Sequence, residues 1–447
     1  MRYNNPIQQR VEEFELNYLE TKYTHTYTYL IFRTAQDDWE MIDAFYDYML
    51  GVDNEIEDVV VVFKSPLQHV QNYSEALVEE LFMSTFLWNY AEKPKEIEDN
   101  FIHWEMDLSA TSEKNVAALF VANINAFCEV VEFEEDSDLV CVLDYQNEEE
   151  QYILHWLKDL AKLELHPKVR LVLSDTIEDP IFDELTYFTP NSIHFLVHRF
   201  ELAQAIKEVA AMGDPDAPDT QYRYHLVQLY EGVNKQQEKE IEKHATSCLA
   251  IANQQKEKDA NWLLQLVSVY CALATAAFGK KEFKKAIVQM DEALAILQEG
   301  LGKLAAELLD PLFGQVYLFR GNLFLMIKSY PKAIADFQKG ETYYEQQQNH
   351  LMRVEAFRLL AMAATKNGDH QLRYEALDKG IRLGVHLTES LALASTYTLL
   401  AKDVLDSRYT EYISDRELDC LVEPLLGKQW RTKTKNVKNS IANKDIK

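Results

Sequence analysis

The chain has 447 residues, of which 47% are hydrophobic and 11% aromatic, a composition that suits two or three globular domains and excludes extensive disorder. Asp and Glu number 73 against 45 Lys and Arg, and the net charge of −28 disfavours nucleic acid and anionic membranes as partners of the body. The first ten residues are polar and no apolar run reaches about 18 residues, so we expect no signal peptide and no membrane span. Five well-separated cysteines suit reduced thiols in a cytoplasmic protein.

The first half of the chain alternates strand-like and helix-like segments. Most of the strand-like runs are apolar on successive residues, which is typical of strands buried on both faces of a mostly parallel sheet. We predict strands at 27–32, 59–63, 139–143, 169–173 and 193–197, with a weaker one at 102–106. Segments of helical period lie between them, at 37–50, 73–90, 115–131, 148–163 and 201–212. Residues 1–212 are therefore predicted to form an α/β domain with helices on both faces of its sheet.

Polar residues follow two of the predicted strands. Asp144 ends the run at 139–143, and Ser174 and Asp175 follow the run at 169–173. This order of elements resembles a P-loop ATPase core of the AAA+ or STAND type. The resemblance implies an aspartate that holds Mg²⁺ at the position of Asp144 and a polar sensor residue at Asp175 or Ser174.

The phosphate-binding loop of those families is missing from this sequence. Residues 33–38, after the first strand, read RTAQDD, and Gly51 is the only glycine among residues 1–212. Such a loop needs glycines whose backbone N–H groups converge on an anion, and two aspartates there would repel a triphosphate. Tyr145 replaces the second acid of the family, and residues 148–150, all glutamate, fit the first turn of a helix. We predict a degenerate domain without cofactor or catalytic residues.

Residues 213–219 read GDPDAPD, which is typical of a linker, and residues 220–427 are predicted to be helical throughout. This part contains a repeat of helix pairs with large and small residues at regular spacing. One unit resembles the tetratricopeptide repeat (TPR) through Tyr317, Gly321, Phe324, Ala333 and Phe337. It departs at Arg320, where that family prefers leucine.

Further units follow the same pattern from Tyr270 and from Phe357, and a weaker one spans 222–253. Matching small residues lie 47 positions apart between Ala286 and Ala333 and 40 apart between Gly340 and Gly380, against about 34 in the consensus repeat. Longer helices or loops must account for the excess. The predicted fold class is thus α/β followed by all-α, a mostly parallel P-loop-NTPase-like sheet and then a TPR-like α-solenoid.

The resemblance implies a concave surface made chiefly by the first helix of each pair, and such surfaces bind peptides or protein segments. Asn322 and Arg358 carry groups that can hydrogen-bond a peptide backbone or carboxylate. Counting along the first helices, the candidate partner-binding residues are Thr275, Gln315, Asn322, Arg358, Met362 and Thr365.

No sequence pattern supports a metal site or nucleophilic catalysis. His194 and His198 are four residues apart in a predicted strand, which places them over about 13 Å apart and too far to share one ion. Residues 428–447 are strongly basic, with Asp445 the one acid, and we expect a disordered tail or a contact with an acidic partner or surface.

These observations predict a non-enzymatic scaffold, adaptor or assembly component that binds protein or peptide partners through the solenoid groove. The alternative is a STAND-type switch, in which the solenoid senses a ligand and the α/β domain still holds a nucleotide through an altered loop. A third hypothesis is an enzyme built from loops at the strand ends near Asp144 and Asp175.

Overall fold

The computed structural model describes residues 5–51, 54–67, 69–91, 101–110, 115–145 and 151–436. The chain forms two compact units, Met1–Val209 and Ala210–Lys447. The division falls three residues before the predicted linker, where Gly213 has a φ of +113°. Glycine adopts that conformation without a steric penalty, so it suits the turn in the segment between residues 210 and 218.

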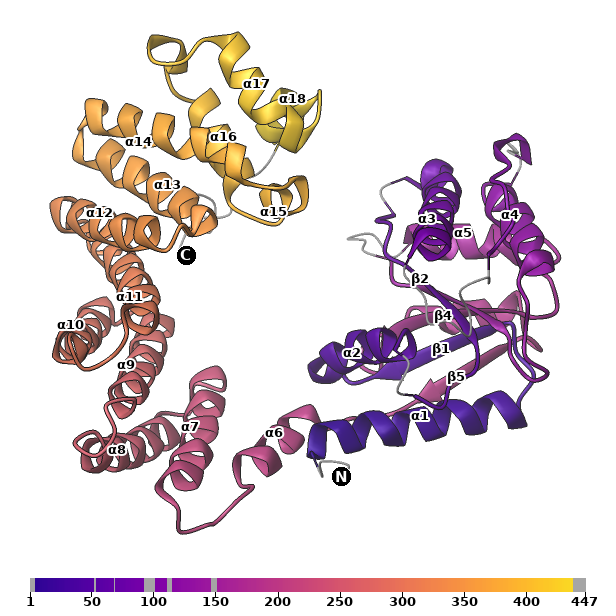
Figure 1. Cartoon of the computed structure of the whole chain (residues 1–447), viewed down its shortest axis with the longest axis horizontal. Coiled ribbons are helices and arrows are strands. Elements are labelled where there is room, and N and C mark those ends of the chain that lie inside the picture. Colours follow the sequence, from indigo (N-terminus) through magenta and orange to yellow (C-terminus); the bar gives the residue numbers. More distant parts are fainter. Residues whose placement is uncertain are drawn as a thin grey trace. The chain divides into compact units, whose positions relative to one another are not determined.

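The first unit contains a five-stranded sheet in which every neighbouring pair is parallel (Figure 1). The strands lie in the order β2-β3-β4-β1-β5, as in a P-loop-NTPase-like sheet, and the five main strand predictions are confirmed. Their bounds are β1 (Tyr29–Thr34), β2 (Val59–Phe63), β3 (Leu139–Leu143), β4 (Val169–Thr176) and β5 (Ile193–Val197).

Helices cover both faces of this sheet, as the apolar runs predicted (Figure 1). On one face α1 (Pro6–Thr24) and α2 (Trp39–Met49) pack against alternate strand residues such as Phe32 and Val142. On the other, α3 (Val70–Tyr90), α4 (Ala118–Val130) and α5 (Gln151–Leu160) pack against residues such as Ile31 and Cys141. The unit ends with α6 (Leu202–Ala210).

Two features of this unit differ from the sequence predictions. Helix α1 was not predicted, because glutamates and asparagine interrupt the apolar stripe that carries the buried Phe14 and Tyr18. The weak strand prediction at 102–106 is wrong, because this segment pairs with no strand. The amide side chain of Asn89 instead donates to the carbonyl of Ile102 and accepts from its N–H, which satisfies backbone groups that a strand would satisfy.

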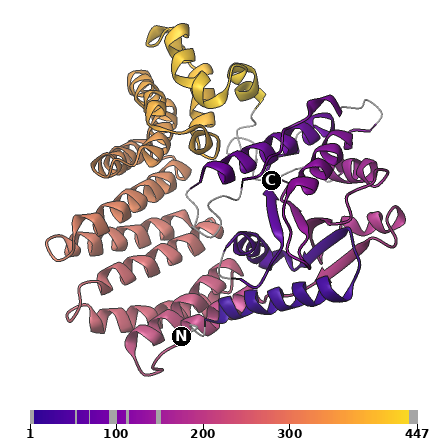
Figure 2. The same ribbon diagram turned by 45° about the vertical axis from the view of Figure 1, so that its right-hand side comes forward.

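The second unit is helical, and its first helices follow one another as hairpins (Figure 2). Each of them packs mainly against the helices before and after it in the chain. The pairs are α7 (Pro218–Asn234) with α8 (Glu238–Gln255), α9 (Trp262–Gly279) with α10 (Phe283–Gly300), α11 (Ala306–Met326) with α12 (Tyr330–Gln346), and α13 (His350–Asn367) with α14 (His370–Arg382).

A left-handed residue closes the turn inside each of these pairs. Gln236, Lys281, Lys328 and Gly368 have φ values of 53°, 61°, 60° and 78°. A residue in this conformation ends a helix and turns the chain back towards it, which produces the hairpin. The turns recur every 40 to 47 residues, in agreement with the spacing seen in the sequence.

Helix α9 is apolar and long enough to cross a membrane by composition alone. It is nevertheless the first helix of a pair between α8 and α10, and residues spread along it are buried against these neighbours, among them Leu266, Val269 and Ala274. Its apolar composition is therefore that of a core helix.

The remaining helices are α15 (Glu389–Leu393), α16 (Tyr397–Leu405), α17 (Asp415–Leu426) and α18 (Trp430–Asn436). Helix α18 corrects the prediction that disorder begins at residue 428. Trp430 is buried and its indole N–H donates to Asp419 at 3.0 Å, while Arg431 donates to the same carboxylate at 2.8 Å. The basic charge of residues 428–447 led to the prediction of a disordered tail, although Trp430 and Arg431 hold this segment to α17. Residues 437–447 of the predicted tail lie outside the described residues.

Candidate protein-binding surfaces

The loop after β1, where a P-loop ATPase holds its phosphates, is occupied by the protein's own carboxylates. Asp38 is buried and accepts hydrogen bonds from the backbone N–H groups of Glu201 and Leu202, at 3.0 and 2.8 Å. It therefore caps α6. The carboxylate of Glu178 accepts the backbone N–H of Gln36 at 3.0 Å. An internal carboxylate thus takes up the Gln36 N–H of this loop, and Asp38 adds a buried carboxylate to it.

The predicted sensor residues at the end of β4 are also engaged. The guanidinium of Arg33 donates to both carboxylate oxygens of Asp175, at 2.8 and 2.9 Å, and to Asp183 at 2.8 Å. This bidentate pair fixes the adjacent ends of β1 and β4, in which Arg33 lies opposite Asp175. The Ser174 hydroxyl forms a hydrogen bond with the Tyr46 hydroxyl, in the core between the sheet and α2.

Asp144, at the end of β3, lies in an acidic environment. Burial raises the pKa of its carboxyl group, and nearby Asp43 and Asp47 raise it further against the opposing effect of Lys64. The glutamates at 148–150 lie outside the described residues. Like charges and burial at this sheet edge oppose the binding of a triphosphate.

His194 and His198 each contact a different partner. The His194 ring lies 4.1 Å from the His25 ring between centroids, whereas the Nδ1 atom of His198 is 3.2 Å from the amide nitrogen of Asn17. The part of the chain that the structure describes contains no group of three or more His, Cys, Asp or Glu arranged for a metal ion.

The structure distributes the six predicted groove residues over three environments. Thr275, Gln315 and Thr365 are exposed, and Asn322 and Met362 are half-buried. Both threonine hydroxyls donate to a carbonyl four residues earlier in their own helix, to Cys271 and Ala361.

Arg358 does not lie at the surface as predicted. Only 6% of it is exposed, and its guanidinium donates to both carboxylate oxygens of Glu355, at 2.7 and 2.8 Å. Asp403, on α16, adds to the electrostatic stabilisation of the charged form and helps to raise the pKa of Arg358. Arg358 therefore supports packing inside the unit.

The sequence predictions did not include an apolar surface of the first unit that lies at the end of α3. Large side chains there are between 39% and 71% exposed, namely Phe82, Met83, Phe86, Leu87, Trp88 and Tyr90. The rings of Phe86 and Tyr90 lie 4.6 Å apart, and Phe101 lies 6.4 Å from Tyr90 between ring centroids. We call these seven residues the α3 apolar face.

The sequence did contain a signal for this face. Residues 81–90 read LFMSTFLWNY and include no charged residue, although their only buried positions are Leu81 and Thr85. A helix with so narrow a buried stripe normally carries charges on its other sides. The absence of charge therefore indicates a surface that something else covers.

Comparison with known proteins assigns this chain to no family. No protein-family profile matches it, and no curated protein matches it. Among solved structures, a chain of one described as "Structure of Drosophila ORC bound to DNA" aligns with a TM-score of 0.27 and 13% identity, over 96% of this chain and 73% of that chain. A likeness this weak carries no argument about function.

Proposed function

We propose that the protein is a non-enzymatic interaction protein, a scaffold, adaptor or component of a multiprotein assembly. The α3 apolar face is the observation that carries this proposal. Phe, Trp, Tyr and Met are enriched at protein interfaces, and several large exposed apolar side chains on one helix end are typical of a binding surface. The internal carboxylates at the strand ends further argue against a nucleotide-dependent activity.

The charge pattern along α3 indicates the chemistry of the partner. Glu75 and Glu79 are exposed, and they precede Met83 and Phe86 at helical spacings of three to four residues on the same side of the helix. No Lys, Arg or His occurs in α3. The face therefore suits a protein segment with apolar side chains and with Lys or Arg beyond one end of its apolar stretch.

We further propose that the second unit is a TPR-like solenoid that binds partners through the first helices of its pairs. Support comes from a close approach between two paired helices. A Cβ atom added to Gly321, on α11, would lie 2.5 Å from the ring of Phe337, on α12. The repeat that the sequence resembles places glycine and an aromatic residue at these two positions. Of the predicted groove residues, Thr275, Gln315, Asn322, Met362 and Thr365 remain available at or near the surface.

A photo-cross-linking amino acid at position 87 tests this proposal, with position 393 as the matched control. Leu87 and Leu393 are 64% and 58% exposed, so both substitutions preserve the core. We expect position 87 of the intact chain to cross-link, in cells, to one or a few proteins through a segment that combines apolar and basic residues. Equal products from both positions, or none from position 87, would count against an interface on α3.

A further inference from the structure

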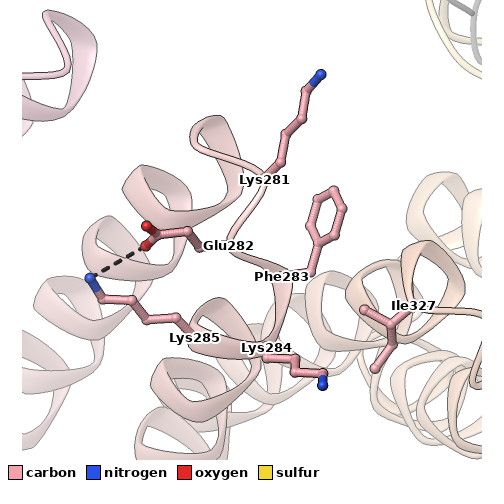
Figure 3. Close-up of a pocket in the computed structure, with 6 residues that line it drawn as sticks. All are labelled: Lys281, Glu282, Phe283, Lys284, Lys285 and Ile327. Atoms are coloured by element: carbon pink, nitrogen blue, oxygen red, sulfur yellow. Dashed lines mark ion pairs between the residues drawn. The ribbon is translucent and has the colours of Figure 1, made fainter. Parts of the chain in front are cut away.

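A surface hollow lies where the turns of two successive helix pairs meet. Its volume is about 570 Å³, and it is lined by Lys281, Glu282, Phe283, Lys284, Lys285 and Ile327 (Figure 3). The first five residues belong to the turn between α9 and α10 and to the start of α10, and Ile327 follows α11. The repeat of the helix pairs therefore creates the hollow.

The rim of the hollow is basic although the whole chain is strongly acidic. Lys281 and Lys284 are exposed and make no ion pair with another residue that the structure describes. Lys285 pairs with the one acid of the rim, Glu282, at 3.4 Å (Figure 3). Lys328 follows Ile327 and is exposed. Three positive charges, those of Lys281, Lys284 and Lys328, thus have no ion pair within the described part of a chain whose net charge is −28.

Backbone geometry does not explain these lysines. Lys281 and Lys328 occupy the left-handed position of their turns, where Gln236 and Gly368 serve in the other two pairs. A lysine costs about 1 kcal/mol or more at such a position relative to glycine. The turn requires the left-handed backbone conformation but no positive charge. The presence of lysine at this position in two successive pairs therefore indicates that the charge itself has a function.

The floor of the hollow is apolar. Phe283 is half-buried, and its ring lies 5.8 Å from that of Phe278 between centroids. Phe278 is 39% exposed and packs edge-to-face against Phe319 at 6.0 Å. Phe283 and Ile327 are thus the apolar residues of the lining, and ring contacts connect Phe283 to Phe278 and Phe319 next to it.

We propose that this lysine-rimmed hollow binds an acidic segment of a partner protein that inserts one aromatic or large aliphatic side chain. The apolar group would cover Phe283 and Ile327, and carboxylates on either side would meet Lys281, Lys284 and Lys328. The flexible lysine side chains can bring their ammonium groups to carboxylates at several positions. We therefore expect the partner segment to be recognised by its negative charge and by one apolar side chain rather than by an exact sequence. This inference rests on the proposed function, because it adds a second binding surface to the same scaffold.

Fluorescence anisotropy on the intact chain tests this inference with three labelled peptides. The probe is a peptide of glutamates and aspartates around one phenylalanine, compared with the same peptide carrying serine in its place and with a lysine-rich counterpart. We expect the phenylalanine peptide to bind more tightly than the serine peptide, and the lysine-rich peptide not to bind at the hollow. Binding should weaken with salt, since exposed charges are screened over about 10 Å at 0.1 M.

Charge-reversed variants locate the binding. The double variant Lys281→Glu, Lys284→Glu should lower the affinity for the phenylalanine peptide about tenfold or more. Two attractive charge interactions with the acidic peptide become repulsive in this variant. The control, Lys366→Glu with Lys379→Glu, makes the same change of charge at exposed positions on α13 and α14 and should leave the affinity within about twofold.

Equal weakening by both double variants would overturn the assignment, because general attraction would then account for binding. Equal affinity for the serine and phenylalanine peptides would show that no apolar side chain inserts into the hollow. Failure of all acidic peptides, with cross-linking from position 87 intact, would reject this hollow and leave the proposed function standing. Circular dichroism confirms that each variant is folded.

Discussion

Arg320 shows how one residue can depart from a repeat pattern without disturbing the fold. It stands where the resemblance prefers leucine, and its guanidinium donates to both oxygens of Asp336, at 2.8 and 2.7 Å, and to Asp291 at 2.6 Å. Asp336, on α12, is 3% exposed, and Asp291 lies on α10. One arginine therefore connects three helices, and the burial of Asp336 depends on it.

Replacing Arg320 with the leucine of the repeat pattern should destabilise the second unit. Arg320→Leu leaves the buried carboxylate of Asp336 without its partner, and such a loss costs about 3 kcal/mol. Combining it with Asp336→Asn should recover about 1 kcal/mol or more, because the unpaired charge is gone. Chemical denaturation followed by circular dichroism measures both. A double variant as unstable as the sum of the two single variants would show that the pair does not couple.

At the residue scale, the helix-pair repeat predicted the exposure of some side chains but not of others, and the predicted binding role of these residues stays a prediction. The register of helix pairs placed Thr275 and Thr365 at the surface, where they lie. It also placed Arg358 there, and this was wrong because Arg358 is buried with charged partners, Glu355 and the more distant Asp403, that follow no repeat. Pairings between side chains far apart in sequence, such as Arg33 with Asp175, leave no periodic signal.

At the scale of helices and strands, two histidines connect α7 and α8. The Nδ1 atoms of His225 and His244 lie 2.9 Å apart, so one ring must donate and the other accept. The Nε2 atom of His244 lies 3.2 Å from the carboxylate of Glu240, which favours an N–H there and leaves the Nδ1 of His244 as the acceptor.

This contact makes the helix pair sensitive to acid. Burial, His244 and Lys243 lower the pKa of His225 below its usual value of 6.5. The unfolded chain therefore binds a proton at a higher pH than the folded one, and stability falls as the pH drops through 6.5 towards the lowered pKa. His225→Gln keeps a donor without a titrating ring. Its melting temperature should fall less than that of the unaltered protein between about pH 7.5 and about pH 5.5.

Differential scanning fluorimetry at the two pH values checks this prediction. His370→Gln is the matched control, because His370 is exposed at the start of α14. The control should show the same fall as the unaltered protein. An equal fall in the His225→Gln variant would exclude the α7–α8 contact as a source of acid sensitivity.

Elements buried on both faces were the easiest to predict. Continuous apolar runs predicted the five strands of the sheet. A strand between two helical layers is buried on both faces, so its residues are apolar in succession and easy to recognise. Helix α1 and helix α18 were missed for the opposite reason, since a few buried anchors such as Phe14 and Trp430 hold otherwise polar segments. The α3 apolar face was overlooked because helical period alone does not separate buried from exposed apolar residues.

At the scale of the whole molecule, we propose an acidic interaction protein made of two units. Its first unit has a five-stranded, P-loop-NTPase-like parallel sheet with side-chain carboxylates at the ends of its strands, and its second unit begins with a run of helix hairpins. The sequence predicted this architecture through the alternation of elements and the helix-pair repeat. The two proposed docking surfaces could not be predicted in this way. The lysine-rimmed hollow combines residues from two separate turns, and the α3 apolar face depends on which side chains of one uncharged helix end are exposed.

Calorimetric titration of Mg·ATP into the intact chain tests the central claim that the sheet edge holds no nucleotide. Asp38 and Glu178 occupy backbone donors there, and Asp175 is held by Arg33. We expect no saturable heat up to about 1 mM nucleotide. The dissociation constant would then lie above about 1 mM, which corresponds to a binding free energy weaker than about −4 kcal/mol. Saturable binding in the micromolar range, lost on Asp144→Asn, would contradict the account and favour a nucleotide-dependent switch.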